Sequence, residues 1–398
     1  MLYLEDGNKE TCYGCRACEE VCPVSCISMR EDEEGFVYPY TDPAKCIHCD
    51  KCKRVCPESY ADFSDTKDIT AFAAINLDSA TVSSCSSGGV FPALCEKLIS
   101  DGYRVYGAVM TEDLKVRHEE ACDIGGCERF RRSKYVQSDM AGCFEKVAAI
   151  LKAKGKAAFS SVPCQCAALK LYLKEKGIDT NGLMLISLLC HGAPSQKLFD
   201  RYICEAEKKY KKNISGYRFR CKDEHKGRKD LRAARIVFDD GSSQYITGKD
   251  DPYLKGYYSR LFLRPSCGHC IFARPERVGD ITIADSWGLK PEFPPGKEKN
   301  GSSLVLCVSD KGKKLYTSCE KELISIPVEK ELALNAQKVM REPVYMHENR
   351  KRFFELVSQK GFYAAVRIAT VPPLKRVINI LVKDGKRKIQ KFFGRGKR

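Results

Sequence analysis

The chain has 398 residues and a mass of 44.8 kDa, which suffices for one large domain with smaller ones attached. Hydrophobic residues make up 43% of it and charged residues 30%, so a sizeable core is expected and disorder throughout is excluded. The net charge is +16, and the 23 cysteines are an odd number. The N-terminus lacks a signal-peptide pattern, and the apolar stretches are too short to cross a bilayer. A secreted disulfide scaffold and a membrane-spanning protein are therefore disfavoured, and metal-bound thiolates in a reducing cytoplasm are the better interpretation.

The first sixty residues carry a tandem repeat of the form C-x2-C-x2-C-x3-C-P. Three thiolates on one tight loop bind three irons of a cubane, and the fourth cysteine ligates the other cluster. Zinc is the alternative, but zinc sites usually combine two C-x2-C arms. The spacing therefore predicts a dicluster ferredoxin-like module over residues 1–60, while Cys26, outside the motif, is expected to be a buried small residue. The predicted ligands are Cys12, Cys15, Cys18 and Cys56 for one 4Fe-4S cluster, and Cys46, Cys49, Cys52 and Cys22 for the other.

After a polar linker at 61–68, strand and helix patterns alternate, which predicts a mixed α/β core over residues 69–355. Strands are expected at Ile69–Leu77, Tyr103–Met110, Lys156–Ser161, Leu183–Cys190, Ile281–Ala284 and Leu304–Val308. Helices are expected at Val90–Ser100, Met140–Gly155, Cys164–Gly177 and Ser195–Lys212. Residues 214–247 are typical of antiparallel strands with a turn at Asp239–Gly241. With the module and a basic helical tail, the predicted fold class is α+β. The fingerprints of a Rossmann dinucleotide site and of a P-loop are both missing.

Four core cysteines lie in contexts that suit metal ligation. Cys164 and Cys190 each follow a predicted strand, and Cys267 and Cys270 form a C-x2-C loop. The carboxyl ends of parallel strands converge on one rim of a sheet, where ligand sites usually lie. The four thiols would therefore make a third four-cysteine site. From spacing alone two alternatives stay open, namely a zinc knuckle at the C-x2-C pair and buried free thiols at the strand ends.

Two other segments suit an anionic ligand. Ser86-Ser87-Gly88-Gly89 is a turn of small residues before a predicted helix, where free backbone amides and the helix dipole favour a phosphate. The loop Arg131–Ser138 is basic. Each segment has an ordinary alternative, since Ser-Gly turns also cap helices and charge runs are often merely solvated.

Together these motifs resemble the beta-subunit family of coenzyme F-420 hydrogenases and dehydrogenases, in its bacterial type with an N-terminal dicluster ferredoxin domain. The resemblance covers roughly residues 10–355 and rests, in chain order, on Ser86–Gly89, Ser133–Ser138, Pro163–Gln165, Cys190–Ser195, Cys267–Cys270, Asp280–Gly288 and Asn349–Phe354. It implies FAD, and a core 4Fe-4S cluster on Cys164, Cys190, Cys267 and Cys270. It also implies FAD contacts from Ser86, Ser87, Gly88, Gly89, Lys134, Gln137, Ser138, Pro163, Gln165, Asp285 and Trp287.

The sequence departs from the family pattern at two places. Ser161-Val162 stands where the family usually has Gly-Thr, and Ala284-Asp285-Ser286-Trp287-Gly288 where it has Gly-Asp-Phe-Trp-Gly. The loss of an aromatic ring at Ser286 leaves open how a second substrate fits and whether F-420 is used.

The resemblance implies an FAD-dependent iron-sulfur oxidoreductase that passes electrons between ferredoxin-type clusters and FAD and exchanges hydride with an unidentified organic substrate or deazaflavin. The alternative is an electron-relay subunit that serves a partner enzyme, with polysaccharide biosynthesis as one setting. The expected partner is an acidic redox protein such as ferredoxin, or a partner oxidoreductase subunit; nucleic acid is not expected. No catalytic residue is assigned because the chemistry would centre on the flavin, and Asp285 and Lys134 are candidates only for pocket polarity.

The last segment, residues 356–398, is predicted to be a basic amphipathic tail. From Ala365 to Arg398 there are eleven Lys or Arg and one Asp. Apolar residues follow helical spacing at Leu374, Val377, Ile378, Leu381 and Val382. The plain interpretation is a terminal helix packed on the core with a solvated basic end. The alternatives are an anionic membrane surface, which would place the protein at the inner face of the membrane, an acidic protein, and nucleic acid without support from the fold.

Overall fold

The computed structural model describes residues 1–63, 69–222 and 230–371, so the predicted tail helix beyond residue 371 lies outside it. In these ranges no helix has the length and apolar character needed to cross a bilayer. The α-helices are α1 (Tyr3–Asp6), α2 (Ala17–Val21), α3 (Lys51–Arg54), α4 (Ser79–Ser84), α5 (Val90–Ser100), α6 (Ile124–Glu128), α7 (Cys143–Lys152), α8 (Pro163–Glu175), α9 (Gln196–Tyr210), α10 (Pro252–Tyr258), α11 (Asp310–Ser318), α12 (Lys330–Asn335), α13 (Arg350–Lys360) and α14 (Phe362–Ala369). The strands are β1 (Ile27–Glu31), β2 (Val37–Thr41), β3 (Thr70–Asn76), β4 (Tyr103–Met110), β5 (Val116–Ala121), β6 (Lys156–Ser161), β7 (Leu183–Leu188), β8 (Ile214–Cys221), β9 (Ala233–Phe238), β10 (Ser243–Ile246), β11 (Ile281–Asp285), β12 (Ser303–Cys307) and β13 (Leu323–Val328).

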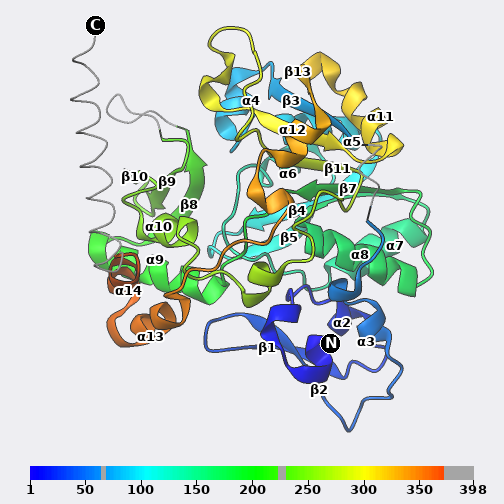
Figure 1. Ribbon diagram of the computed structural model, residues 1–398, viewed down its shortest axis with the longest axis vertical. Coiled ribbons are helices and arrows are strands. Elements are labelled where there is room, and N and C mark those ends of the chain that lie inside the picture. Colours follow the sequence, from blue (N-terminus) through cyan, green and yellow to red (C-terminus); the bar gives the residue numbers. More distant parts are fainter. Residues whose placement is uncertain (64–68, 223–229, 372–398) are drawn as a thin grey trace, which may run out of the picture.

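An eight-stranded sheet forms the centre of the core (Figure 1), in the order β13-β3-β12-β11-β7-β6-β4-β5. The four strands β11, β7, β6 and β4 pair in parallel, and the remaining strands pair antiparallel. Nearly every residue of β6 and β7 is buried, because helices cover both faces of the sheet there. The predicted mixed α/β core is present, and the carboxyl ends of the four parallel strands share one edge.

Two helical layers sandwich the parallel strands. Helices α7 and α8 pack on one face, with Phe144 and Leu169 in the same buried cluster as Phe159 of β6. Helices α5 and α11 pack on the other, with Leu94 and Leu315 in the cluster of Ala158. The alternation of Ala158 and Phe159 between these two clusters is the two-residue repeat of a strand buried on both faces.

A third layer is built around aromatic rings. Strands β10, β9 and β8 form a small antiparallel sheet that packs with α9, α10, α13 and α14. The cluster contains Phe199 and Tyr202 of α9, Tyr217 of β8 and Phe362 of α14, all buried. The boundary expected at residue 355 therefore falls inside α13, and the core packing continues through Ala369, which is also buried. Residues up to this point belong to the core rather than to a separate tail.

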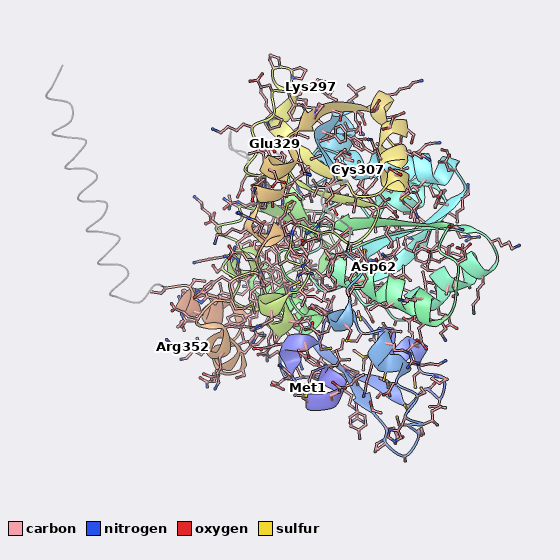
Figure 2. The ribbon with its side chains drawn as sticks, turned by 45° about the vertical axis from the view of Figure 1, so that its right-hand side comes forward. Met1, Asp62, Lys297, Cys307, Glu329 and Arg352 are labelled. Atoms are coloured by element: carbon pink, nitrogen blue, oxygen red, sulfur yellow. The ribbon has the colours of Figure 1, made fainter. Side chains whose placement is uncertain are left out.

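The cysteine-rich module lies at one end of the molecule, below α7 and α8 (Figure 1). In Figure 2 Met1 marks this end, while Lys297 and Glu329 lie toward the opposite one. Charged contacts tie it to the core: Arg54 Nε is 2.7 Å from Glu175 Oε2 in α8, and Arg350 Nη1 is 2.9 Å from Glu34 Oε1. Several such contacts on different sides fix the orientation of the module on the core.

Most predicted elements are confirmed, with differences at the edges. The helix expected from Met140 begins only at Cys143, because Gly142 has a left-handed φ of 69° and caps it. Strands β5 and β13 and helix α11 were not expected. The strand β5 lies at the sheet edge and has the sequence Val-Arg-His-Glu-Glu-Ala. Its four consecutive polar residues lack the alternation of apolar and polar residues that predicts a strand.

We expect Gly88→Ala to lower the free energy of unfolding by about 1–3 kcal/mol, because overpacking distorts the sheet. A Cβ at Gly88 would lie 2.3 Å from Ala74 O and 2.7 Å from Ser303 N, both backbone atoms of adjacent strands. The matched control is Gly125→Ala in α6, where the nearest atom would be Asp123 Oδ1 at 3.5 Å. Thermal or urea unfolding of both variants measures the difference, and equal midpoints would contradict the close approach.

Candidate functional site

The carboxyl ends of the four parallel strands open into one cavity of about 660 Å³. Ala108 of β4, Ser161 of β6, Leu188 of β7 and Asp285 of β11 all line it. A volume of this size lies within the range of small-molecule and cofactor sites, which typically hold about 300–1,000 Å³. The cavity therefore sits where a parallel sheet usually binds its ligand.

The four core cysteines line this same cavity, although they lie far apart in the sequence. Cys164 is the second residue of α8, and Cys190 lies two residues beyond β7. Cys267 is in a short 3-10 helix, Pro265–His269, and Cys270 follows it directly. Burial raises the pKa of Cys190 and of Cys270 to about 12, and neighbouring thiols add to the effect. Without a ligand these thiols stay protonated near neutral pH, and binding to a metal would release their protons.

The donor set around these thiols suits an iron-sulfur cluster. Gly192 N donates a hydrogen bond to Cys190 Sγ at 3.4 Å, and N–H donors of this kind tune cluster potentials. Gly192 has a φ of 99°, and a Cβ there would lie 2.6 Å from Leu263 Cδ1, so only glycine fits. In the described ranges no three or more His, Cys, Asp or Glu side chains group closely enough to hold a single metal ion. Cys164, Cys190, Cys267 and Cys270 are the residues that would hold a cluster.

The module brings the predicted first ligand set together. Burial raises the pKa of Cys18 well above its usual range, and the nearby thiols of Cys15, Cys12 and Cys56 contribute. In the second set, burial together with the thiols of Cys49 and Cys46 raises the pKa of Cys52. The first group therefore joins thiols from both halves of the repeat. In the second group the mutually close thiols come from one loop of the repeat.

Cys26 is buried as expected, but it lies beside a predicted ligand. Its Sγ is 3.3 Å from Cys22 Sγ, and its backbone N–H points to the same sulfur at 3.3 Å. The spacing C-P-x-x-C, with Cys26 four residues after Cys22, was the only sequence signal for this proximity. The second predicted cluster site thus has a fifth thiol next to it.

The lining of the cavity is strongly cationic. The Ser86–Gly89 turn precedes α5, and Ser133 N donates to Ser86 Oγ at 2.8 Å, so the two predicted anion-binding segments meet. Among the described residues that line the cavity, Asp285 is the only acidic one. The cationic ones are Arg131, Arg132, Lys134, Arg220, Arg260, Arg264, Arg277 and Lys338. This excess of positive charge suits a ligand that carries phosphates.

Gly88 differs from the other three residues of the turn. Ser86, Ser87 and Gly89 line the cavity, whereas Gly88 faces the backbone of β3 and β12. The left-handed conformation belongs to Gly89, which has a φ of 77°, and not to Gly88. The cofactor contact of Gly88 stays a prediction, whereas the close packing of the strands already explains why a glycine stands there.

Three of the predicted cofactor contacts are engaged in holding the cavity wall. Lys134 Nζ donates to Arg129 O and Arg131 O, each at 2.9 Å, and burial lowers its pKa to about 7. Gln137 Nε2 donates to Tyr13 O of the module at 2.8 Å. Asp285 accepts from both terminal nitrogens of Arg220, at 2.9 and 3.2 Å. These three side chains therefore hold neighbouring segments of the cavity wall in place.

Arg220 is the residue that the sequence did not reveal. It lies at the end of β8 with its side chain buried, and its Nη2 also donates to Ser86 O at 3.0 Å. The ring of Trp287 lies 5.2 Å from the guanidinium carbon. Arg220 therefore connects the small sheet, the Ser86 turn and the end of β11, a role that no local motif signals.

A neutral polar network lines the strand ends. His118 Nδ1 lies 2.7 Å from Ser138 Oγ, and burial lowers the pKa of His118 to about 4, so the ring is neutral near pH 7. Gln165 Nε2 donates to Ser138 O at 3.3 Å, and Gln165 Oε1 accepts from Ser161 Oγ. Pro163 occupies the first position of α8, where its missing N–H costs nothing. His118 was not predicted as a site residue.

Two parts of the chain match known families. Residues 154–330 match a family described as the C terminus of the beta subunit in coenzyme F420 hydrogenase/dehydrogenase, and residues 11–60 match a 4Fe-4S dicluster domain. No curated protein is significantly similar in sequence. Among solved structures, one protein of the F420-reducing [NiFe] hydrogenase complex from Methanosarcina barkeri has 15% identity and a TM-score of 0.46, covering 76% of this chain and 95% of that one. The two family matches confirm the resemblance seen in the sequence.

We expect about twelve iron and twelve acid-labile sulfide per chain after anaerobic purification, from three four-cysteine sites. About eight iron with one zinc would instead support the zinc interpretation of Cys267 and Cys270.

The variant pair Cys22→Ala and Cys26→Ala tests the ligand assignment at the second cluster. Cys22→Ala should lose about four iron, because it removes a predicted ligand, whereas Cys26→Ala should keep all three clusters. Iron and sulfide analysis of both purified variants decides this. Loss of iron in Cys26→Ala, or its full retention in Cys22→Ala, would show that Cys26 is the ligand.

Proposed function

The chain joins a 4Fe-4S dicluster domain to a domain of the coenzyme F420 hydrogenase/dehydrogenase beta-subunit family, and from this premise we propose that it is an FAD-dependent iron-sulfur oxidoreductase. Electrons would pass between a redox partner and an organic substrate or deazaflavin. The observation that carries the proposal is that four core thiols and eight cationic side chains line one and the same cavity. Flavin exchanges electron pairs with organic molecules and single electrons with clusters, so both cofactors belong at one place.

The contact between module and core supports an electron path. Tyr13, between two predicted ligands of the first cluster, lines the cavity, and its Oη accepts from Ile271 N at 3.4 Å. Burial raises the pKa of Tyr13 far above its usual range, and the nearby thiols of Cys270 and Cys164 contribute. The first cluster site is therefore a neighbour of the core thiols, which short-range electron transfer requires.

The second cluster site suits exchange with an external partner. The loop that carries Cys46 and Cys49 is largely exposed, and Ile47 between them is 59% exposed. An acidic ferredoxin or a partner oxidoreductase subunit would dock there. The proposed order is partner, second cluster, first cluster, core cluster and FAD, and the path can be used in either direction.

The open side of the cavity is proposed to receive the substrate. Trp287 is 41% exposed, and its ring centroid lies 5.8 Å from that of His191, which follows Cys190. The Ser286 hydroxyl lies 2.5 Å from Ser302 Oγ, and this side chain is smaller than the ring that the family usually has here. A planar organic substrate or a deazaflavin would stack near Trp287 beside the flavin, while Arg220 holds this wall in place.

The second candidate function is an electron-relay subunit of a larger oxidoreductase. The exposed Cys46–Cys49 loop favours it, because a stable partner subunit would cover this loop. A turnover assay on the isolated chain distinguishes the enzyme from the relay subunit. The isolated chain, loaded with FAD and clusters, should oxidise or reduce a small hydride donor or acceptor if it is an enzyme. Activity only after addition of a partner protein would support the relay, and purification without any flavin or cluster would contradict both.

The proposed electron path predicts that Cys49→Ser slows one route of flavin reduction and not the other. Reduction of the flavin by an external low-potential donor should slow at least tenfold, because the entry cluster is damaged, whereas direct reduction by a hydride donor should be unchanged. The control is Cys204→Ser, which changes an exposed thiol of α9 outside all three sites. Stopped-flow absorbance of the flavin measures both rates. Equal slowing of both reactions would contradict the proposed order.

Flavin affinity should fall as pH rises above about 7. Lys134 has a pKa lowered to about 7 by burial and by the charge of Arg132. An anionic cofactor favours the protonated amine and raises that pKa on binding. Below pH 7 the amine is already charged, so pH has little effect, whereas above it binding must take up a proton and affinity drops by up to about tenfold per unit. Fluorescence titration with FAD from pH 6 to about 9 measures it.

The matched variants for the pH effect are Lys134→Arg and Lys134→Met. Arginine stays charged over this range, so the first variant should lose this part of the pH dependence and keep high affinity. The methionine variant should bind weakly and independently of this titration. A wild-type pH profile that both variants retain would show that Lys134 is not the titrating group.

A further inference from the structure

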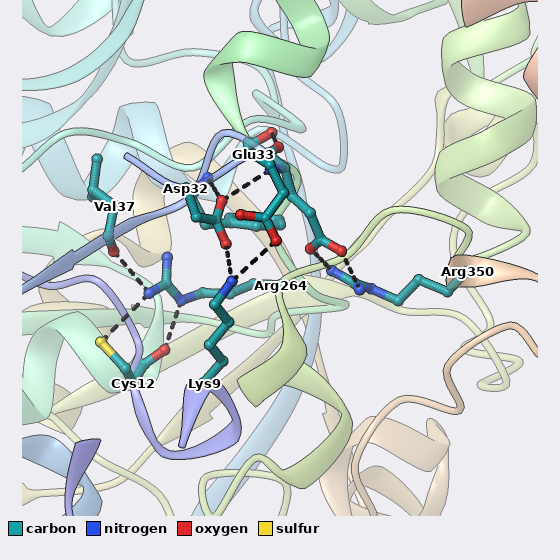
Figure 3. A network of polar contacts seen from close by, with 10 residues as sticks. Lys9, Cys12, Asp32, Glu33, Val37, Arg264 and Arg350 are labelled. Atoms are coloured by element: carbon teal, nitrogen blue, oxygen red, sulfur yellow. Dashed lines mark hydrogen bonds and ion pairs between the residues drawn. The ribbon is translucent and has the colours of Figure 1, made fainter. Parts of the chain in front are cut away.

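Arg264 is a core residue whose side chain ends inside the cysteine-rich module. It directly precedes the short helix that carries Cys267, and its side chain is buried, with 1% exposed. Its Nε donates to Cys12 O at 2.6 Å, and its Nη2 donates to Cys12 Sγ at 3.4 Å and to Val37 O at 2.9 Å (Figure 3). Its Nη1 donates to Gln137 Oε1 at 3.1 Å. One guanidinium thus joins a predicted ligand of the first cluster to the loop of the core cluster.

The module is built to admit this side chain. Gly14, between Cys12 and Cys15, has a φ of 62°, and a Cβ there would lie 2.6 Å from Arg264 Nη1. The guanidinium carbon lies 4.4 Å from the ring centroid of Tyr38 and 5.4 Å from that of Phe36. Only glycine leaves the guanidinium room on one side, and aromatic faces stabilise its charge on the other.

The charge of Arg264 has no carboxylate partner within 4.0 Å among the residues that the structure describes. A buried cation is costly unless an anion or several acceptors compensate it. Among the described residues, Cys12 carries the one thiol to which it donates a hydrogen bond, and a cluster-bound thiolate carries negative charge. The arrangement is therefore complementary to a charged cluster at Cys12 rather than to a neutral thiol.

We propose that Arg264 raises the reduction potential of the first cluster and so favours electron transfer from the second cluster to the first; this inference rests on the proposed function. Reduction adds one negative charge to a cluster, and a nearby cation with an N–H to sulfur bond stabilises that charge. The step is transfer of one electron between two clusters, with no bond made or broken. Arg264 is a positioning residue, because it contacts the predicted cluster ligand Cys12 and not the cluster itself.

Arg350 provides a matched control at the same boundary. Its Nη1 donates to Glu34 Oε1 at 2.9 Å and its Nε to Leu263 O at 2.9 Å, so it also ties the module to the core. In the described part of the chain it makes no hydrogen bond to a thiol of the module, although its charge reaches Cys267 of the core site. Figure 3 shows both arginines reaching the module from the core. A purely structural role of Arg264 would therefore be shared by Arg350, whereas an effect on the potential of the first cluster would not.

The test is an anaerobic redox titration, followed by electron paramagnetic resonance, of the full chain and of Arg264→Gln, Arg264→Lys and Arg350→Gln. In Arg264→Gln the reduction potential of one cluster should fall by at least about 59 mV. For a one-electron couple this is a tenfold change in the equilibrium constant of reduction. Arg264→Lys keeps the charge but cannot make all the bonds of the fork, so its shift should have the same sign and be smaller. Arg350→Gln should leave the potential of the first cluster unchanged.

Each outcome decides the inference. Unchanged potentials in Arg264→Gln, or an equal shift in Arg350→Gln, overturn it while the proposed function stands. If Arg264→Gln does not fold, Arg264→Lys decides, because an unshifted potential in that variant also overturns it. A wild-type chain that holds no clusters removes the proposed function and this inference together.

Discussion

The parallel pairing of β4, β6, β7 and β11 is the constraint on which the rest of the site depends. Ser161 at the end of β6 is in register with Ser187 near the end of β7, so the segments that carry Cys164 and Cys190 begin side by side. The C-x2-C loop precedes β11 in the chain, yet its two cysteines lie at the carboxyl ends of the parallel strands, where they line the cavity. Residues 271–280 then return the chain to the start of β11, with Phe272 and Val278 packed in the cluster of α7 and α8. A cavity between three chain segments results, and the Ser86 turn and Arg220 close its other side.

The module has little apolar core of its own and depends on two kinds of support. Its small buried cluster contains Cys12, Phe36 and Tyr38, and the other buried rings, Tyr13 and Tyr60, pack into the cluster of the core helices. Cluster ligation supplies folding energy inside the module, and contacts with the core fix its position. Electron transfer needs both, since a cluster must be formed and must also lie close to the next one.

The sequence was informative where chemistry depends on local spacing. The cysteine repeat, the strand ends before Cys164 and Cys190, and the Ser86 turn were all visible, because ligation and helix capping involve residues near one another in the chain. Arg220, His118 and Arg264 were not visible as site residues. Their roles come from tertiary contacts with segments more than forty residues away, and an arginine on a strand or in a loop has no periodicity that marks it. Strand β5 was missed for a related reason, since an edge strand buries only one side and tolerates charge.

Trp287 is the one tryptophan of the chain, and it stands at the rim of the cavity beside Arg220 and His191. Its fluorescence therefore comes from a single known position, free of other indole emission. The absorption of an oxidised flavin overlaps indole emission, so a flavin in the cavity would quench the signal by energy transfer, and reduction would change the quenching. A polar ligand that moved Arg220 would instead alter the cation near the ring and shift the emission wavelength. The molecule thus carries its own optical reporter at this cavity, which needs no added label.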